Sequence, residues 1–312
     1  MTSQGIAYIP PRKVVQGKGR AEVHVFGDNA HFSELSYTYP LKLLSPRQTT
    51  AARDAAAQRV AILYNLTYGG GLIGGDRVEL SLDVKPDAKL VLLTQGSTKI
   101  FPSRPTPRLS SGRLEATEGA YQPGGSLLLL DWLTSGRMSR GEEWQFDRYR
   151  SVNEVWIGTT QVACDVLLLD QATEQNKATP STGGGSVDND AHDNLSGQTN
   201  RQSRKLHRSL APYACYATVL MYGPCTRAIS NHLRGQYDQI TQLQRRTPPE
   251  PLIWSYSPLE GSSFSSVSTD AFDGCIVRVA GTETEAVRRW LREALRGLES
   301  QIGKDAYSKA FV

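Results

Sequence analysis

The alternation of apolar and polar residues along the chain predicts a protein built mainly from β-strands. From Val78 to Val84, apolar residues alternate with Glu, Ser and Asp, as in a strand with one buried and one solvated face. Segments 21–25 and 35–39 repeat this alternation. Denser apolar stretches, which are typical of strands covered on both faces, occur at 89–94, 127–130, 166–169 and 213–222. Because glycine and proline separate these short segments, we expect a mainly β fold.

Two segments in the C-terminal third have helical periodicity. Apolar residues recur at three- and four-residue spacing between Val287 and Leu298 and form one stripe. The preceding Thr282-Glu283-Thr284-Glu285 matches a capping box, in which the Thr282 hydroxyl caps the helix. A second helix is predicted from about Thr226 to Leu243.

Residues 171–209 are predicted to be an insertion. Only Val187, Leu195 and Leu206 are large and apolar in it, and the rest is dominated by Gly, Ser, Thr, Asn, Asp and Gln. Such a stretch cannot bury enough surface to offset the entropy lost on ordering. We therefore expect a disordered low-complexity insertion within a single domain that spans residues 1–312. A smaller loop of the same kind is expected at 262–270.

Composition and charge argue against several classes of protein. The chain is 39% hydrophobic and 21% charged, as in soluble globular proteins. Its net charge of +4 is small and dispersed, so nucleic acid is not an expected partner. No apolar run approaches the roughly 18 residues of a membrane helix. The four cysteines are far apart and form no C-x-x-C pair, which favours a cytoplasmic protein with reduced thiols.

Gly69-Gly70-Gly71-Leu72-Ile73-Gly74 satisfies the G-x-G-x-x-G pattern of dinucleotide-binding loops. That fingerprint requires a helix after the loop, because the amides and dipole of the helix N-terminus receive the phosphates. Here Gly75-Asp76 and the alternating strand follow instead. A turn with positive φ between strands is the favoured interpretation. A dinucleotide-dependent enzyme and a loop that admits a partner backbone are the alternatives.

Elsewhere the chain carries polar clusters rather than catalytic motifs. Its five histidines form no H-E-x-x-H pair, and neither a G-x-S-x-G elbow nor a P-loop lysine motif occurs. Polar residues directly follow buried-looking strands at 93–100 and at 136–144. Surface turns explain each cluster alone, but two in one β-rich chain indicate a shared polar site.

Taken in order, four blocks of the chain resemble the urease accessory protein D family, called UreD or UreH. The blocks are Gly70-Gly71-Leu72-Ile73-Gly74-Gly75-Asp76, Leu93-Thr94-Gln95-Gly96-Ser97-Thr98-Lys99-Ile100, Gly136-Arg137-Met138-Ser139-Arg140-Gly141-Glu142-Glu143-Trp144 and Val277-Arg278-Val279-Ala280-Gly281. They cover most of the chain outside the insertion. The resemblance implies a β-rich domain with a helical-barrel-like winding of strands and about two α-helices near the C-terminus.

The resemblance also implies a non-catalytic maturation factor. Members of the family bind urease apoprotein and recruit the accessory protein UreF and the nickel-carrying GTPase UreG. Nickel is thought to reach the urease active site through the UreD scaffold. The nucleotide would belong to UreG, which agrees with the missing P-loop. A generic β-rich interaction module without a metal role remains an alternative.

A nickel conduit needs weak, spaced ligands. A divalent ion can move between carboxylates, hydroxyls and waters if no site holds it with several strong ligands. We therefore expect transient nickel, no tight metal site and no tightly bound cofactor. The candidates for nickel passage or partner docking are Asp76, Thr94, Gln95, Lys99, Asp131, Arg137 and Glu142. Gly70, Gly71, Gly74 and Gly75 are the structural glycines of the loop.

The chain departs from the family between Ile100 and Ser126. Family members usually carry a Leu-Pro-Asp-Pro-type segment and further strands there, whereas residues 119–125 lead straight into the strand at 126–130. Missing strands would leave unpaired edges and an opened core. We therefore expect a fold of reduced competence in this region.

Overall fold

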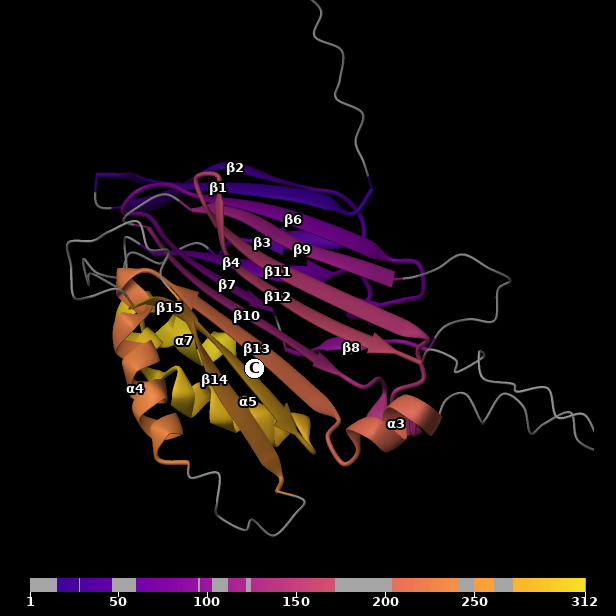
Figure 1. Ribbon diagram of the computed structural model, residues 1–312. Helices are drawn as coiled ribbons and strands as arrows, with labels where there is room; N and C mark the ends of the chain where they lie inside the picture. Colours follow the sequence, from indigo (N-terminus) through magenta and orange to yellow (C-terminus); the bar gives the residue numbers. More distant parts are fainter. Residues whose placement is uncertain are drawn as a thin grey trace, which may run out of the picture.

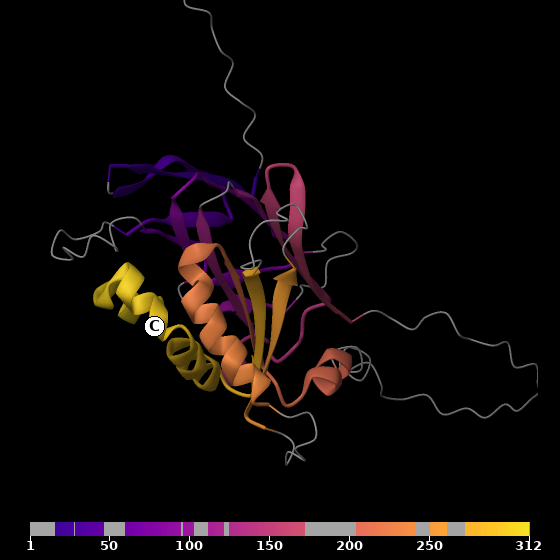
Figure 2. The ribbon, with the colours of Figure 1, turned by 60° about the vertical axis from the view of Figure 1, so that its left-hand side comes forward.

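The computed structural model describes residues 16–27, 29–46, 60–94, 96–102, 112–121, 125–171, 204–240, 250–260 and 272–311. Within this part, the chain forms two stacked β-sheets, and a group of helices lies against one of them (Figures 1 and 2). The expectation of a mainly β fold is confirmed.

Sheet A has six strands among the described residues, in the order β12-β11-β9-β6-β1-β2. In chain order they are β1 (Lys18–Phe26), β2 (Asn29–Tyr37), β6 (Arg77–Val84), β9 (Gly112–Tyr121), β11 (Arg148–Ile157) and β12 (Thr160–Asp170).

Sheet B has nine strands in the described part, and its main path is β14-β15-β13-β10-β7-β4-β3. The short strands β5 and β8 pair with each other, and β8 also pairs with β10. The bounds are β3 (Leu41–Leu44), β4 (Val60–Thr67), β5 (Gly71–Leu72), β7 (Lys89–Thr94), β8 (Thr98–Ile100), β10 (Ser126–Thr134), β13 (Cys215–Tyr222), β14 (Leu252–Glu260) and β15 (Phe272–Gly281).

The chain winds back and forth between the two sheets, in keeping with the strand winding that the resemblance implies. In sheet A, β1, β6, β9 and β11 are parallel neighbours, and in sheet B the same is true of β4, β7 and β10. Parallel strands need a crossover connection. Here each crossover includes a strand of the other sheet, so the chain passes back and forth between the sheets.

Strand β10 contributes to two hydrophobic cores. Leu127, Leu129 and Leu133 face the core between the sheets, whereas Leu128 and Trp132 face the core between sheet B and the helices. Successive side chains of a strand point to opposite faces, so a strand covered on both sides reads as a continuous apolar run. The runs at 89–94 and 127–130 were therefore interpreted correctly.

The prediction for residues 166–169 was wrong. Val166 is 51% exposed and Leu168 is 48% exposed. They lie on β12, which is the edge strand of sheet A, and the helices pack on sheet B instead. Only one face of β12 is therefore covered, although its sequence is apolar on both.

Both predicted helices are present, as α4 (Arg227–Asp238), which ends earlier than the predicted Leu243, and α5 (Thr284–Ala294). The capping box is wrong, because α5 has Glu283 as its N-cap and no side chain caps it. The Thr282 hydroxyl donates instead to the carbonyl oxygen of Pro251 (3.3 Å) beside β14. Further helical segments are α3 (Arg204–Leu210), α6 (Glu299–Ile302), α7 (Lys304–Ala310), and the 3-10 turns η1 (Met138–Arg140), η2 (Pro224–Thr226) and η3 (Arg296–Leu298). No helix of the described part is long and apolar enough to span a bilayer.

The apolar stripe of α5 should be a main support of the second core. Leu291 has no exposed surface, whereas the Arg289 side chain is 78% exposed. We expect Leu291→Ala to lower the free energy of unfolding by about 2–5 kcal/mol. Arg289→Ala should change it by less than about 0.5 kcal/mol. Urea unfolding measures both values, and equal effects would contradict this packing.

The structure also corrects two expectations, one about an unpaired strand edge after Ile100 and one about the end of the insertion. The region between Ile100 and Ser126 contains β9, which pairs with β6 on one side and β11 on the other, so the expected open edge is absent there. Residues 204–209 are helical in α3, because Leu206 enters the inter-sheet core and its N–H donates to Gln171 (3.2 Å). Residues 172–203 and the loop at 262–270 lie outside the described residues.

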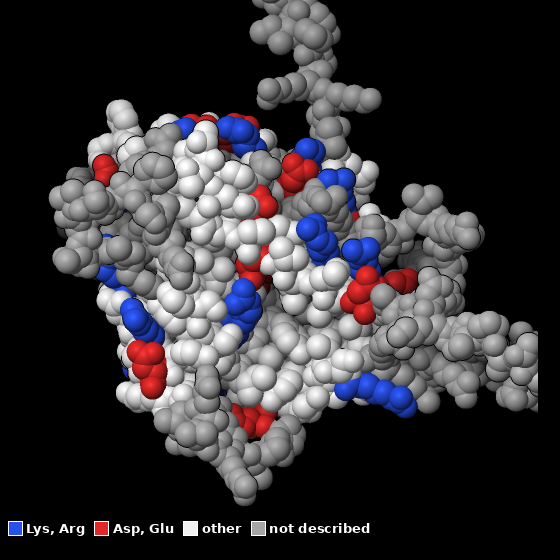
Figure 3. Space-filling view, in the orientation of Figure 1, with Lys and Arg blue, Asp and Glu red and all other residues white. Residues whose placement is uncertain are grey.

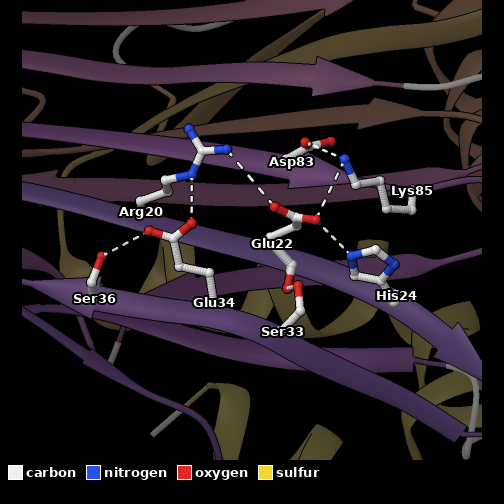
Figure 4. Close-up of polar contacts among 8 residues, drawn as sticks. All are labelled: Arg20, Glu22, His24, Ser33, Glu34, Ser36, Asp83 and Lys85. Atoms are coloured by element: carbon white, nitrogen blue, oxygen red, sulfur yellow. Dashed lines mark hydrogen bonds and ion pairs between the residues drawn. The ribbon is translucent and has the colours of Figure 1, made fainter. Parts of the chain in front are cut away.

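Charged residues on β1, β2 and β6 form a network on sheet A (Figure 4). Glu22 lies opposite Glu34 and Asp83 on the neighbouring strands, an arrangement that would be repulsive without cations. His24 Nε2 lies 2.6 Å from Glu22 Oε1, and this hydrogen bond lowers the pKa of Glu22. Arg20 bonds Glu34 (2.8 Å), and Lys85 bonds Asp83 (2.6 Å). The network therefore helps to hold the register of β1 between its neighbours.

Candidate functional site

Three of the sequence blocks meet at one end of sheet B. In the short strands, Gly71 pairs with Lys99, and Lys99 pairs with Thr134. The N–H of Phe101 donates to the carbonyl oxygen of Leu72 (2.9 Å). We call the described residues of 70–76, 96–101 and 134–144 the loop cluster. Tertiary pairing thus joins the glycine-rich, Thr-Gln and Gly-Arg blocks in one region.

The glycine-rich block is a turn, and the dinucleotide alternative is not supported. Gly69, Gly70 and Gly75 have positive φ, and the chain continues into β6. No helix N-terminus follows the loop to receive a pyrophosphate. Gly71 is required for close approach, because a Cβ there would lie 2.4 Å from the carbonyl oxygen of Lys99. Asp76 closes the turn, since its carboxylate accepts from the N–H of Ile73 (3.0 Å).

The Gly-Arg block is a loop held by an internal ion pair. Arg137 donates to Glu142 through Nε (2.6 Å) and Nη2 (2.5 Å), and it lies over the Phe101 ring (5.6 Å to the centroid). These hydrogen bonds lower the pKa of Glu142 and raise that of Arg137. The N–H of the buried Trp144 donates to the carbonyl oxygen of Ser135 (2.9 Å). Arg137 and Glu142 therefore satisfy each other and shape the loop.

A row of polar residues crosses the inner face of sheet B. Asp131 pairs with Thr218, and Thr218 pairs with Arg278 on the next strand. Residues of the same parity on these strands, such as Leu129 and Leu220, line the inter-sheet core, so the row faces sheet A. The same alternation places further polar residues on this face: Asn65 on β4, Thr94 on β7 and Ser255 on β14.

Sheet A places polar residues opposite this row. Ser151 and Asn153 on β11 and Asp165 on β12 are all buried. Two side-chain hydrogen bonds link these residues to the row on sheet B. The Ser151 hydroxyl donates to Asp131 Oδ2 (3.4 Å), and Arg278 Nη2 donates to Asp165 Oδ1. We call the group that surrounds these contacts the inter-sheet site; its members are Thr94, Asp131, Ser151, Asn153, Asp165 and Arg278.

Burial controls the electrostatics of the inter-sheet site. The pKa of Asp131 is raised to about 6, mainly by loss of solvation; the hydrogen bond from Ser151 lowers it, and the charge of Asp165 makes a smaller contribution that raises it. Burial, followed by the charge of Asp131, raises the pKa of Tyr149 well above its ordinary value. The Thr94 hydroxyl is buried and has no hydrogen-bond partner in the described part of the chain. Burying a hydroxyl without a hydrogen bond costs free energy, so its presence in the core calls for an explanation.

The donor set suits weak and exchangeable binding of a divalent ion. Carboxylate, hydroxyl and amide side chains of both sheets line this part of the core, but the described residues contain no group of three His, Cys, Asp or Glu arranged for a metal. A closed cage of strong ligands is therefore not formed by these residues. The four cysteines are free thiols, and two of them, Cys215 and Cys275, are buried.

Two of the predicted candidates, Thr94 and Asp131, belong to the inter-sheet site. Asp76, Lys99, Arg137 and Glu142 lie in the loop cluster, and Gln95 lies outside the described residues. Sequence reasoning did not single out Ser151, Asn153, Asp165 or Arg278. Arg278 could have been singled out from the sequence, because it is the one charged residue in the apolar run 275–280, as Asp131 is in the run 127–133.

The described residues show no continuous stripe of positive charge on the face drawn in Figure 3. Lysine and arginine are interspersed with aspartate and glutamate there, and wide uncharged areas separate them. A nucleic-acid surface would require a continuous stripe of positive charge. The charge distribution on this face agrees with the small net charge of +4.

Comparison with known proteins agrees with the sequence blocks. The family model described as UreD urease accessory protein matches residues 16–122 and 116–187. Urease accessory protein 4 of Cryptococcus neoformans var. grubii is 31% identical over 352 residues, which cover 96% of this chain and 96% of that protein. Urease accessory protein UreD of Sorangium cellulosum is 30% identical, covering 86% of this chain and 76% of its own. Urease accessory protein D of Arabidopsis thaliana is 25% identical, covering 93% and 99%.

These relatives are all named as accessory proteins of urease. The similarity extends along nearly the whole chain, and the family model alone spans more than half of it. The chain therefore belongs to the UreD family of urease accessory proteins.

Proposed function

We propose that this protein is a cytoplasmic, non-catalytic maturation factor that binds apo-urease together with UreF and UreG and passes nickel to the urease active site. The observation that carries the proposal is the inter-sheet site, where oxygen ligands from two sheets meet inside an otherwise apolar core. Membership of the urease accessory family supports urease as the client.

The chemistry of the site fits a moving cargo. A divalent nickel ion at Asp131 would have one carboxylate and nearby neutral oxygens, such as those of Thr94 and Ser151. Ligands of this kind hold nickel less firmly than thiolate or imidazole groups do. The ion can therefore leave for a client that offers stronger ligands. The partially exposed Thr218 and Arg278 continue the row toward solvent.

The loop cluster is the proposed docking surface for a protein partner. Lys99 is exposed on β8, Ile73 is 47% exposed in the neighbouring turn, and Gly69 and Gly70 leave open space beside it. This combination of an apolar side chain, open backbone and a positive charge fits a protein interface with an acidic rim on the partner.

We expect Lys99→Glu to lower capture of urease or UreF about tenfold, because a reversed charge repels an acidic rim. The matched control is Lys304→Glu on α7, which should leave capture unchanged. Pull-down from cells that co-express the partners measures the effect, and thermal unfolding confirms that both variants are folded. Equal capture by wild type and Lys99→Glu would remove the loop cluster as the docking surface.

Reconstitution tests the whole proposal. Co-expression with apo-urease, UreF and UreG should give a complex and active urease. A chain that never co-purifies with urease or UreF would contradict the proposal. Nickel loading of urease with and without the protein separates a conduit from a generic β-rich interaction module, since the module alone should not change the loading.

A further inference from the structure

The pair formed by Arg278 and Asp165 joins the two sheets at the edge of the inter-sheet site. Arg278 comes from β15 of sheet B, and its Nη2 donates to Asp165 Oδ1 on β12 of sheet A. The Asp165 side chain is 4% exposed, whereas the Arg278 side chain is 46% exposed. The guanidinium therefore neutralises a buried carboxylate at the place where the site meets solvent.

Without this arginine, the site would offer a divalent ion several oxygen ligands. Asp131 and Asp165 come from opposite sheets, and Ser151, which donates to Asp131 (3.4 Å), lies on β11 two residues from the residue that pairs with Asp165. Asn153 pairs directly with Asp165 across β11 and β12. The buried Thr94 hydroxyl, which has no partner within the described chain, comes from the strand next to Asp131 and faces the same side. Two carboxylates with an amide and a hydroxyl suit a divalent cation.

We propose that Arg278 is an internal cation that takes the place of a metal ion beside Asp165 and so prevents the inter-sheet site from retaining nickel. This inference rests on the proposed passage of nickel and explains why the inter-sheet site binds the ion only weakly. One carboxylate is satisfied by the guanidinium, so an arriving ion meets only Asp131 and neutral oxygens. Removing the arginine would leave the Asp165 carboxylate buried and uncompensated, and a divalent ion bound there would restore the compensation.

The test is nickel binding by the tag-free, full-length protein, measured by isothermal titration with Ni²⁺ alone. Arg278→Met keeps much of the apolar stem and removes the charge. We expect this variant to bind about one additional ion per chain, at least about tenfold more tightly than wild type binds nickel. The double variant Arg278→Met/Asp165→Asn should return to the wild-type level, because the second carboxylate is then lost.

A matched control removes an arginine from an exterior ion pair. Arg296 bonds Glu293 (2.6 Å), and both side chains are largely exposed, at 71% and 64%. Arg296→Met should not change nickel binding, because Glu293 alone offers one solvated carboxylate. If Arg296→Met increased nickel binding as much as Arg278→Met does, the role assigned to the inter-sheet arginine would be wrong.

A folded Arg278→Met protein that binds no more nickel than wild type would overturn the inference. If that variant does not fold, Arg278→Gln gives the same comparison, because its amide can still donate to Asp165. The proposed function is tested separately by urease activation in co-expression. If Arg278→Met bound nickel more tightly but urease activation did not change, the inference about Arg278 would stand. The proposed passage of nickel through this site would be refuted.

Discussion

Asp131→Asn is expected to stabilise the protein while it impairs nickel delivery. In the folded chain the pKa of Asp131 is raised from 3.8 to about 6, mainly because burial disfavours the charged form. Between these two pKa values the folded chain binds this proton more strongly than the unfolded chain does. The free energy of unfolding therefore falls as the pH rises from the unfolded pKa through the folded pKa. At pH 7.5 the charged group therefore destabilises the fold by up to about 3 kcal/mol. Asparagine removes this charge and can still accept the hydrogen bond from Ser151.

Urea unfolding over a pH series measures the first effect. The gain in free energy of unfolding of Asp131→Asn over wild type should be largest at pH 7.5. It should vanish as the pH falls through about 6 toward 4, where the wild-type carboxyl is protonated. Urease activation in co-expression measures the second effect, and we expect a loss of at least about tenfold. Asp170→Asn is the control, because it removes a carboxylate from a partly exposed pair with Arg148 (3.5 Å). If Asp131→Asn supported urease activation as well as wild type does, Asp131 would be excluded from the nickel path.

Gly136→Ala is expected to disrupt the Gly-Arg loop. The φ of Gly136 is +143°, and a Cβ at this position would lie 2.1 Å from the carbonyl oxygen of Glu142. Neither atom can move without displacing the backbone that holds Arg137 and Glu142 together. We expect the free energy of unfolding to fall by about 3 kcal/mol or more. Capture of urease or UreF should fall as well, because the loop cluster loses its shape.

Gly141→Ala is the matched control in the same loop. Gly141 also has a positive φ, +70°, but a Cβ there would meet nothing within 4 Å. Its replacement should lower the free energy of unfolding by about 1–2 kcal/mol, which is the cost of the left-handed backbone alone. Urea unfolding compares the two variants. If both changed stability equally, the close contact at Gly136 would not be what shapes the loop.

Several features of the fold were readable from local patterns. Period-two alternation identified β6, and the continuous apolar runs identified β7 and β10 as strands covered on both faces. The apolar stripe from Val287 identified α5. These predictions succeeded because strand and helix periodicity depend on near neighbours in the chain. The resemblance to the UreD family also rested on short local blocks in a characteristic order.

Local patterns failed where neighbours from elsewhere decided the outcome. Residues 166–169 look like a strand covered on both faces, but β12 belongs to sheet A, whereas the described helices pack on sheet B, so one face of β12 stays exposed. The motif at Thr282 looks like a capping box, but the carbonyl oxygen of Pro251 receives that hydroxyl. In both cases the tertiary arrangement decided the outcome: one face of β12 has no covering layer in the described part of the chain, and Thr282 has a partner from another segment.

The sequence by itself determined the β-rich class, the main helices and the family, because these depend on periodicity and on ordered local blocks. Only the tertiary structure determined the inter-sheet site, whose residues Asp131, Ser151, Asp165 and Arg278 come from four strands of two sheets. The physical reason is that strand pairing and sheet stacking bring distant residues together. A lone aspartate or arginine in an apolar strand shows that something must compensate its charge, but not which residue does so.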